Sequence, residues 1–168
     1  MSTYGYTSRY SLADYTVTID FPGYGDLKGE KISIGGPGEN GYGSCVGEIK
    51  VTRNKELWTT EGDPTGSWVH NKDLNRTGTV EINLRQVSDQ IYKLMQICQA
   101  YEGATRNVKG LEITVNPVGD FGFPIIDFIT CEDCMITKIP DQDYRETAQE
   151  QTWIFTCGRV SFPNQSMD

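Results

Sequence analysis

Several features typical of enzymes and membrane proteins are scarce in this 168-residue sequence. It contains one histidine, His70, and no G-x-S-x-G motif, so a nucleophilic triad has little support. The most apolar window, residues 121–129, is interrupted by Gly122, Pro124 and Asp127, and it falls short of the roughly 18 apolar residues of a membrane span. Because no basic start followed by an apolar run is present, we expect neither a secretory signal nor a membrane anchor.

Basic residues are also few, with 15 Lys and Arg against 23 Asp and Glu, which gives a net charge of −8. The acids are spread along the chain and no basic arm or stripe stands out, so stable nucleic-acid binding is not expected. Hydrophobic residues make up 37% of the sequence, which is too many for a disordered chain. The length and the absence of a linker predict a single domain over residues 1–168.

Metal-binding and nucleotide-binding patterns are incomplete. Cys131-x-x-Cys134 lacks the second cysteine pair or added histidines of a four-ligand zinc site, so we expect no metal and no cofactor. The Gly36–Gly41 match to G-x-G-x-x-G contains Pro37 and is followed by a strand pattern, which favours a surface loop over a dinucleotide site. With no catalytic constellation, the chain is not expected to be an enzyme.

What the sequence does contain is the alternation of apolar and polar residues that is typical of half-buried strands. In the clearest strand, Val80, Ile82 and Leu84 take one face and polar side chains take the other. Similar patterns predict strands at 15–21, 31–34, 48–52, 77–85, 111–115, 125–130, 134–139 and 152–162. Between them we expect a Gly-rich loop at 35–47 and a hairpin loop at 56–71.

One segment changes to helical spacing. Ser88 is a favourable N-cap and Gly103 suits a helix end, so we predict one helix over about 88–102. Its apolar residues recur every three or four positions, at Ile91, Leu94, Met95, Cys98 and Tyr101. The order of the predicted elements, strands followed by one helix and then by further strands, predicts a mainly β fold. We expect an antiparallel β-sandwich or barrel with one flanking α-helix.

The three tryptophans, Trp58, Trp68 and Trp153, allow two interpretations. They can form the sugar-stacking platform of a carbohydrate-binding module, or they can be core and interface residues. We favour the second interpretation, and the first remains an alternative.

Short blocks in a particular order resemble the tail tube proteins of long-tailed bacteriophages with contractile tails. The blocks are residues 10–20, Glu48–Lys55, His70–Lys72, Arg76–Leu84, the helix at Ser88, Cys134–Asp141 and Trp153–Arg159. The resemblance implies a structural virion protein with a tail-tube-like fold. Six copies close a ring, and rings stack into the inner tube that pierces the host envelope and conducts DNA during ejection.

The same resemblance implies the partners. These are other copies of the chain, the contractile sheath protein, and baseplate and tail-terminator proteins, with DNA only as transiting cargo. Assembly takes place in the host bacterial cytoplasm and the mature protein lies in the virion tail. Two alternatives stay open: the tube of a DNA-free contractile injection particle or type VI-like system, and a carbohydrate-binding β-sandwich module.

Four polar side chains on two of the predicted strands are candidates for the lumen wall: Glu48, Lys50, Glu81 and Asn83. An acidic lumen would repel the phosphates of the transiting duplex rather than bind them. Because Lys50 opposes this trend, a neighbouring acid is expected to offset its charge.

Ring-to-ring contacts are expected in the two long loops, with Gly38, Gly41, Trp58 and Trp68 as candidates. Cysteines give a further hypothesis, because a virion leaves the reducing cytoplasm and disulfides then persist. The candidates are Cys45, Cys131 and Cys134. The alternative, in which all five cysteines remain thiols, is favoured.

Overall fold

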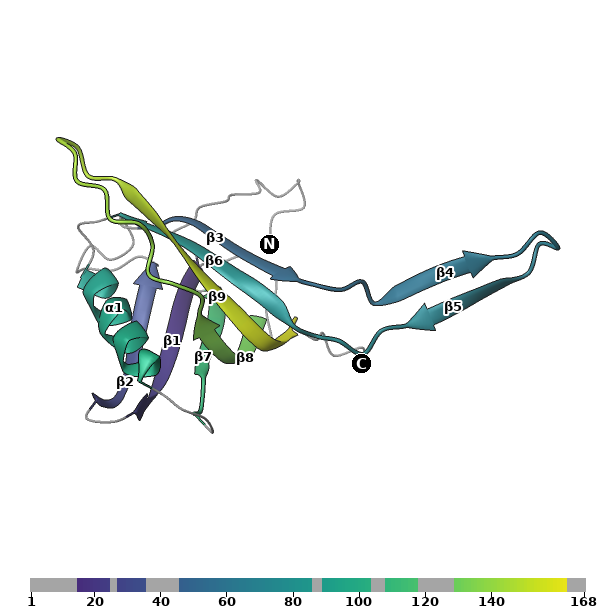
Figure 1. Cartoon of the computed structure of the whole chain (residues 1–168), viewed down its shortest axis with the longest axis horizontal. Coiled ribbons are helices and arrows are strands. Elements are labelled where there is room, and N and C mark those ends of the chain that lie inside the picture. Colours follow the sequence, from purple (N-terminus) through teal and green to yellow (C-terminus); the bar gives the residue numbers. More distant parts are fainter. Residues whose placement is uncertain are drawn as a thin grey trace, which may run out of the picture.

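The computed structural model describes residues 15–24, 27–35, 46–85, 89–103, 108–117 and 129–162 (Figure 1). Within these ranges lie nine strands and one helix. They are β1 (Tyr15–Tyr24), β2 (Leu27–Gly35), β3 (Val46–Arg53), β4 (Trp58–Gly62), β5 (Trp68–Lys72), β6 (Gly78–Arg85), α1 (Asp89–Glu102), β7 (Leu111–Pro117), β8 (Ile129–Ile136) and β9 (Glu150–Ser161).

Seven of the strands form one antiparallel sheet in the order β2-β1-β7-β8-β9-β6-β3. The sheet twists and curls, and α1 covers one of its faces (Figure 1). Among the described residues, the remaining strands, β4 and β5, pair with each other and with no other strand. The expected mainly β, antiparallel fold with one flanking helix is therefore confirmed, in the form of a single open, curled sheet.

The core lies between the sheet and α1 because every long strand turns its apolar residues to the same face. In β6 the buried residues alternate with partly exposed ones, as the sequence pattern predicts. Trp153 and Phe155 of β9 have no exposed surface and are the largest side chains of this part of the core. Each contributes about 2–3 kcal/mol by burial.

The helix α1 begins and ends within one residue of the predicted range. Its buried residues Ile91, Leu94 and Ile97 join the core, and the helix packs against β1 and β2. On the exposed side, Lys93 Nζ lies 2.9 Å from a Glu30 carboxylate oxygen, which adds a surface ion pair of small energy. None of the helices in the described parts of the chain is long and apolar enough to cross a membrane.

The prediction of two strands at 125–130 and 134–139 is wrong in detail, because a single strand, β8, runs through both cysteines of the C-x-x-C pair. Residues 125–128 lie outside the described residues. Asp133 adopts a φ of 54°, in the left-handed region, and this kink separates two inward-facing residues by two outward-facing ones. Cys131 and Cys134 therefore both point into the core.

The first hairpin is longer than its sequence pattern suggests. The strands predicted at 15–21 and 31–34 extend toward each other, because β1 continues to Tyr24 and β2 already begins at Leu27. Gly23 makes this possible because it adopts a φ of 96°, a conformation in which a residue with a side chain would be strained. Of the range 35–47 expected as a Gly-rich loop, Gly35 ends β2, Val46 and Gly47 begin β3, and residues 36–45 lie outside the described residues.

Candidate assembly surfaces

The β4–β5 hairpin projects away from the seven-stranded sheet along the longest dimension of the molecule (Figure 1). β4 lies within the expected range 56–71, β5 extends one residue beyond it to Lys72, and every residue of both strands is exposed. A two-stranded hairpin without a third strand or a covering helix is marginally stable in water. An arm of this kind gains stability by packing on another surface.

The tip of the arm is held by Asp63. One carboxylate oxygen of Asp63 accepts hydrogen bonds from the Thr65 hydroxyl at 2.5 Å, the Thr65 amide at 2.9 Å and the Ser67 amide at 3.0 Å. The bond from the Thr65 hydroxyl is the main reason that the pKa of Asp63 lies below its usual 3.8, although the group is fully exposed. Gly66 completes the turn with a φ of 92°.

Both tryptophans of the arm lie on one face. Trp58 pairs with Lys72 and Trp68 pairs with Gly62, so the backbone positions of the two tryptophans lie four residues, about 13 Å, apart along the hairpin. Trp68 is 66% exposed, and the Lys72 ammonium lies 5.7 Å from the Trp58 ring centroid. Val69, on the other face, is 59% exposed. The arm therefore presents large apolar side chains to solvent.

The direction of the arm is fixed at its base. The Asp73 amide donates to the Leu57 carbonyl at 2.9 Å, and the Asn54 amide donates to the Thr77 carbonyl at 3.0 Å. These bonds continue the pairing between the arm and the β3–β6 ladder. In addition, the Arg53 guanidinium donates two hydrogen bonds to the Val160 carbonyl, at 2.8 and 3.1 Å. The two chain segments that connect the arm to the sheet, 54–57 and 73–77, are thus held together by hydrogen bonds.

The four lumen candidates lie together on the polar face of the sheet, opposite the core. The register pairs Glu48 with Asn83 and Lys50 with Glu81 across β3 and β6. Thr152 of β9 lies beside them and donates a hydrogen bond to the Asn83 side-chain oxygen. Glu81 is thus the neighbouring acid that the sequence analysis required beside Lys50.

The two outermost strands of the sheet, β2 and β3, each pair with one neighbour within the described residues. Their outer edges present backbone donors and acceptors to another chain. β6, in contrast, is paired on both sides, with β3 and β9. Of the two strands that carry the lumen candidates, only β3 therefore has an outer edge among the described residues.

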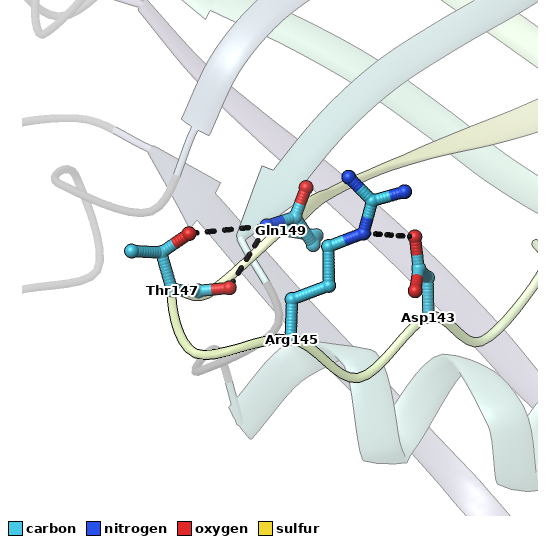
Figure 2. Close-up of polar contacts among 4 residues, drawn as sticks. All are labelled: Asp143, Arg145, Thr147 and Gln149. Atoms are coloured by element: carbon cyan, nitrogen blue, oxygen red, sulfur yellow. Dashed lines mark hydrogen bonds and ion pairs between the residues drawn. The ribbon is translucent and has the colours of Figure 1, made fainter.

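A surface that the sequence reasoning missed lies at the other end of the molecule, where residues 137–149 pass beside α1 (Figures 1 and 2). Two grooves flank Ile139 there, of about 390 and 290 Å³. Tyr92 and Tyr144 line the second groove and are 66% and 84% exposed. The sequence did contain a signal for this surface, because Tyr92 is an aromatic residue on the helix face away from the apolar stripe.

The segment 137–149 is held by short-range polar contacts. Figure 2 shows Arg145 Nε donating to an Asp143 carboxylate oxygen at 2.9 Å, and the Gln149 side-chain amide donating to the Thr147 carbonyl at 2.9 Å. The acids of this segment are Asp141, Asp143 and Glu146, and the bases are Lys138 and Arg145. The segment is therefore acidic on balance.

The remaining candidates are divided between the core and the parts outside the described residues. Gly38, Gly41 and Cys45 belong to the latter group. Cys131 and Cys134 are fully buried as free thiols, next to Cys157, which the sequence reasoning had not included. Trp153 is a core residue rather than part of an exposed aromatic platform.

A family model described as "Bacteriophage PhiTE tail tube protein" matches residues 7–162 of the chain. No curated protein sequence matches it. Among solved structures, the anti-feeding prophage cap, a tube-terminating cap, is similar with a TM-score of 0.55 and 11% identity, over 95% of this chain and 94% of that one.

Two structures from an extracellular contractile injection system, PVC, are also similar. Its sheath/tube terminator has a TM-score of 0.51 and 13% identity, over 91% of this chain and 95% of that one. Its sheath-tube complex has a TM-score of 0.52 and 14% identity, over 91% and 90% of the two chains. At such low identities these matches show a shared fold.

Proposed function

The chain belongs to the family of the bacteriophage PhiTE tail tube protein, and from this membership we propose that six copies close into a ring and that rings stack into a hollow tube. As a tail tube protein it is a structural component of a phage tail or tail-like particle, and the proteins of this kind that it resembles are not enzymes. The family match over residues 7–162 is the observation that carries the proposal.

Ring closure uses the two free edges of the sheet. An edge strand left unpaired is prone to uncontrolled pairing, and a closed ring removes that hazard because each edge meets the edge of a neighbour. The outer edges of β2 and β3 are at opposite ends of the strand order, which suits a head-to-tail contact between successive subunits. The sheet then continues from one copy to the next.

Stacking of rings uses the β4–β5 arm. The arm and the segment 137–149 lie at opposite ends of the longest dimension of the molecule (Figure 1). If that dimension follows the tube axis, the arm of one ring reaches the next ring, and Trp58 and Trp68 become buried anchors. The expected contribution of Gly38 and Gly41 to the same contact stays a prediction.

The polar face with Glu48, Lys50, Glu81 and Asn83 faces the lumen in this proposal. Of these four side chains two are acids and one is a base, and Lys50 is offset by the directly opposed Glu81. DNA passing this patch meets no excess of positive charge to which its phosphates would bind. Replacing both Glu48 and Glu81 by Lys is expected to slow DNA ejection, and an unchanged rate of ejection would argue against this assignment.

The opposite face, with α1 and the segment 137–149, is then on the outside of the tube. The similar PVC structures contain sheath together with tube, or a sheath/tube terminator. We extend these associations to the present chain as a contractile sheath, a terminator and a baseplate, with assembly in the cytoplasm of the host bacterium. The exposed Tyr92 and Tyr144 provide contact area for a sheath subunit.

Negative-stain electron microscopy of the purified protein tests the proposal. Uniform hollow tubes or six-fold rings are the expected result. Uniformly monomeric particles at high protein concentration would contradict it. The variant Trp68→Ala is the matched control for stacking, because it is expected to leave rings intact while shortening or abolishing tubes.

Two further experiments address the alternatives. DNA recovered from nuclease-treated particles that contain this subunit distinguishes a phage tail from a DNA-free injection particle. A glycan array tests the carbohydrate-binding module, since Trp58 and Trp68 do share an exposed face. Specific glycan binding that is lost in Trp68→Ala, without tubes or rings, would favour the module.

A further inference from the structure

Three thiols gather on the core side of β8 and β9, in the middle of the seven-stranded sheet. Cys131 and Cys134 come from β8 and Cys157 comes from β9, and all three are buried. Cys134 and Cys157 are directly opposed in the β8–β9 register. Their Sγ atoms lie 2.9 Å apart, with the Cys134 thiol donating to the Cys157 sulfur.

We propose that Cys134 and Cys157 form a cross-strand disulfide when the protein meets a small-molecule disulfide oxidant. One protein thiol, as its thiolate, attacks the oxidant and releases one small thiol. The second protein thiolate then attacks the resulting mixed disulfide and releases the other small thiol. One S–S bond forms in the protein, the S–S bond of the oxidant is lost, and the two thiol protons end on the two small thiols.

The backbone geometry fits this bond. Directly opposed residues in an antiparallel pair have Cα atoms about 4.5–5.5 Å apart, within the roughly 4.4–6.8 Å that disulfides span. The two sulfurs must approach by only about 1 Å from their present separation to bonding distance. Cys131 is a poorer partner, because its directly opposed residue on β9 is Val160 rather than Cys157.

The surroundings of Cys157 slow its oxidation. A hydrogen bond with Cys131 lowers the pKa of Cys157, but the hydrogen bond with Cys134 and burial outweigh it and raise that pKa to about 12. The hydrogen bond with Cys157 and burial also raise the pKa of Cys131. Because the thiolate is the reactive species, Cys131 and Cys157 are slow to oxidise at neutral pH.

The disulfide would constrain one part of the subunit. It would close a covalent loop around residues 135–156, which include the segment that borders α1. β8 and β9 could then no longer separate, and the segment 137–149 would be tethered at both ends. Particles outside a cell meet oxidising surroundings, where such a bond persists.

The test refolds the chain from urea in oxidised or reduced glutathione, so that access of the oxidant to the buried sulfurs is not limiting. Free thiols are blocked, and the protein is digested with an endoproteinase that cleaves after glutamate. Cleavage at Glu132 separates Cys131 from Cys134. We expect a linked peptide pair that contains Cys134 and Cys157, and a thermal midpoint about 5–10 °C higher in the oxidised protein than in the reduced one.

Matched variants identify the pair. Cys131→Ala is expected to keep the linked peptides and the rise in midpoint, whereas Cys134→Ala and Cys157→Ala lose both. The midpoint is compared between oxidised and reduced forms of the same variant, so the cost of the substitution itself cancels. A dominant Cys131–Cys157 link, or a fully reduced Cys134 after refolding in oxidised glutathione, would overturn the proposal.

Discussion

The seven-stranded sheet and the β4–β5 arm are built from the same kind of element but follow opposite rules of burial. In β6 and β9 about every second side chain is buried, and the tryptophan of β9 has no exposed surface. In β4 and β5 every residue is exposed, including two tryptophans. The sheet is therefore stabilised by its own core, whereas the arm leaves its large apolar side chains in solvent.

The largest expected difference between the two regions concerns their tryptophans. Trp153→Ala removes a fully buried ring and leaves a cavity, so the free energy of unfolding should fall by about 3–5 kcal/mol. Trp68→Ala removes an exposed ring and should change it by less than about 0.5 kcal/mol. Urea denaturation followed by circular dichroism measures both. Similar losses in the two variants would mean that the arm packs on its own subunit.

Proline substitutions separate the inner ladder of the sheet from its free edge. Successive backbone N–H groups of a strand point to opposite sides, so Ile49→Pro and Lys50→Pro remove donors from different edges of β3. One of the two variants loses a bond to β6 and should unfold. The other should remain folded but fail to form rings, as size-exclusion chromatography can show. Normal rings from the folded variant would argue against pairing through β3.

Proline at Ile82, on β6, does not offer the same test. β6 is paired on both sides, with β3 and with β9. A proline there breaks a ladder within the subunit whichever way the N–H points. We expect loss of folding rather than a selective loss of rings.

Two glycine substitutions compare the sheet with the arm through smaller changes in the free energy of unfolding. A Cβ added at Gly78 would lie 2.4 Å from a Val160 methyl carbon and 2.5 Å from the Thr52 carbonyl oxygen. Gly78→Ala should therefore cost about 1–3 kcal/mol through overpacking. At Gly62, in the arm, the nearest atom is 3.9 Å away, so Gly62→Ala should be close to neutral. Chemical denaturation of the two variants side by side measures the difference.

The smallest expected effect is a pH dependence confined to the arm. Hydrogen bonding, first from the Thr65 hydroxyl, lowers the pKa of Asp63 below its usual 3.8. A group whose pKa is lower in the folded state stabilises that state above its unfolded pKa and loses this effect as the pH falls through the folded value. Amide exchange at Thr65 and Ser67 should therefore accelerate below about pH 4 relative to the intrinsic rate.

Asp63→Asn is the control for this prediction. The amide oxygen can still accept hydrogen bonds but does not titrate in this range. The variant should show no such pH dependence at the tip. Equal acceleration in the wild type and the variant would assign the effect to another group.

The strand and helix assignments followed from local pattern, and the outcome shows where local pattern is sufficient. The alternation in β6 and the helical spacing of α1 were visible because a period of two or of 3.6 repeats over many residues. The strand prediction from local pattern failed around Cys131 and Cys134. There Asp133, with a positive φ, shifts the alternation of inward-facing and outward-facing residues, and one strand runs where two were expected. Sequence alternation cannot reveal a kink of this kind unless the special backbone conformation is known.

For the candidate surfaces, the sequence determined which residues are polar or aromatic, but not which of them lie together. The sequence alone determined that Glu48, Lys50, Glu81 and Asn83 are polar positions on amphipathic strands, and that Trp58 and Trp68 flank a turn. Only the tertiary structure decided that β3 pairs with β6 in the register that sets Lys50 against Glu81. Register between distant segments depends on how all the apolar faces pack together, which no single segment encodes.

The cysteines give the same lesson. The C-x-x-C spacing drew attention to Cys131 and Cys134, which are close in sequence, whereas the partner of Cys134 in the fold is Cys157 on the neighbouring strand. Composition and periodicity determined that this is an acidic, antiparallel β protein with one helix. Long-range packing decided which strands became edges, which thiols lie together and which tryptophans stayed in solvent. Those relations join residues that lie far apart along the chain, so no local pattern specifies them.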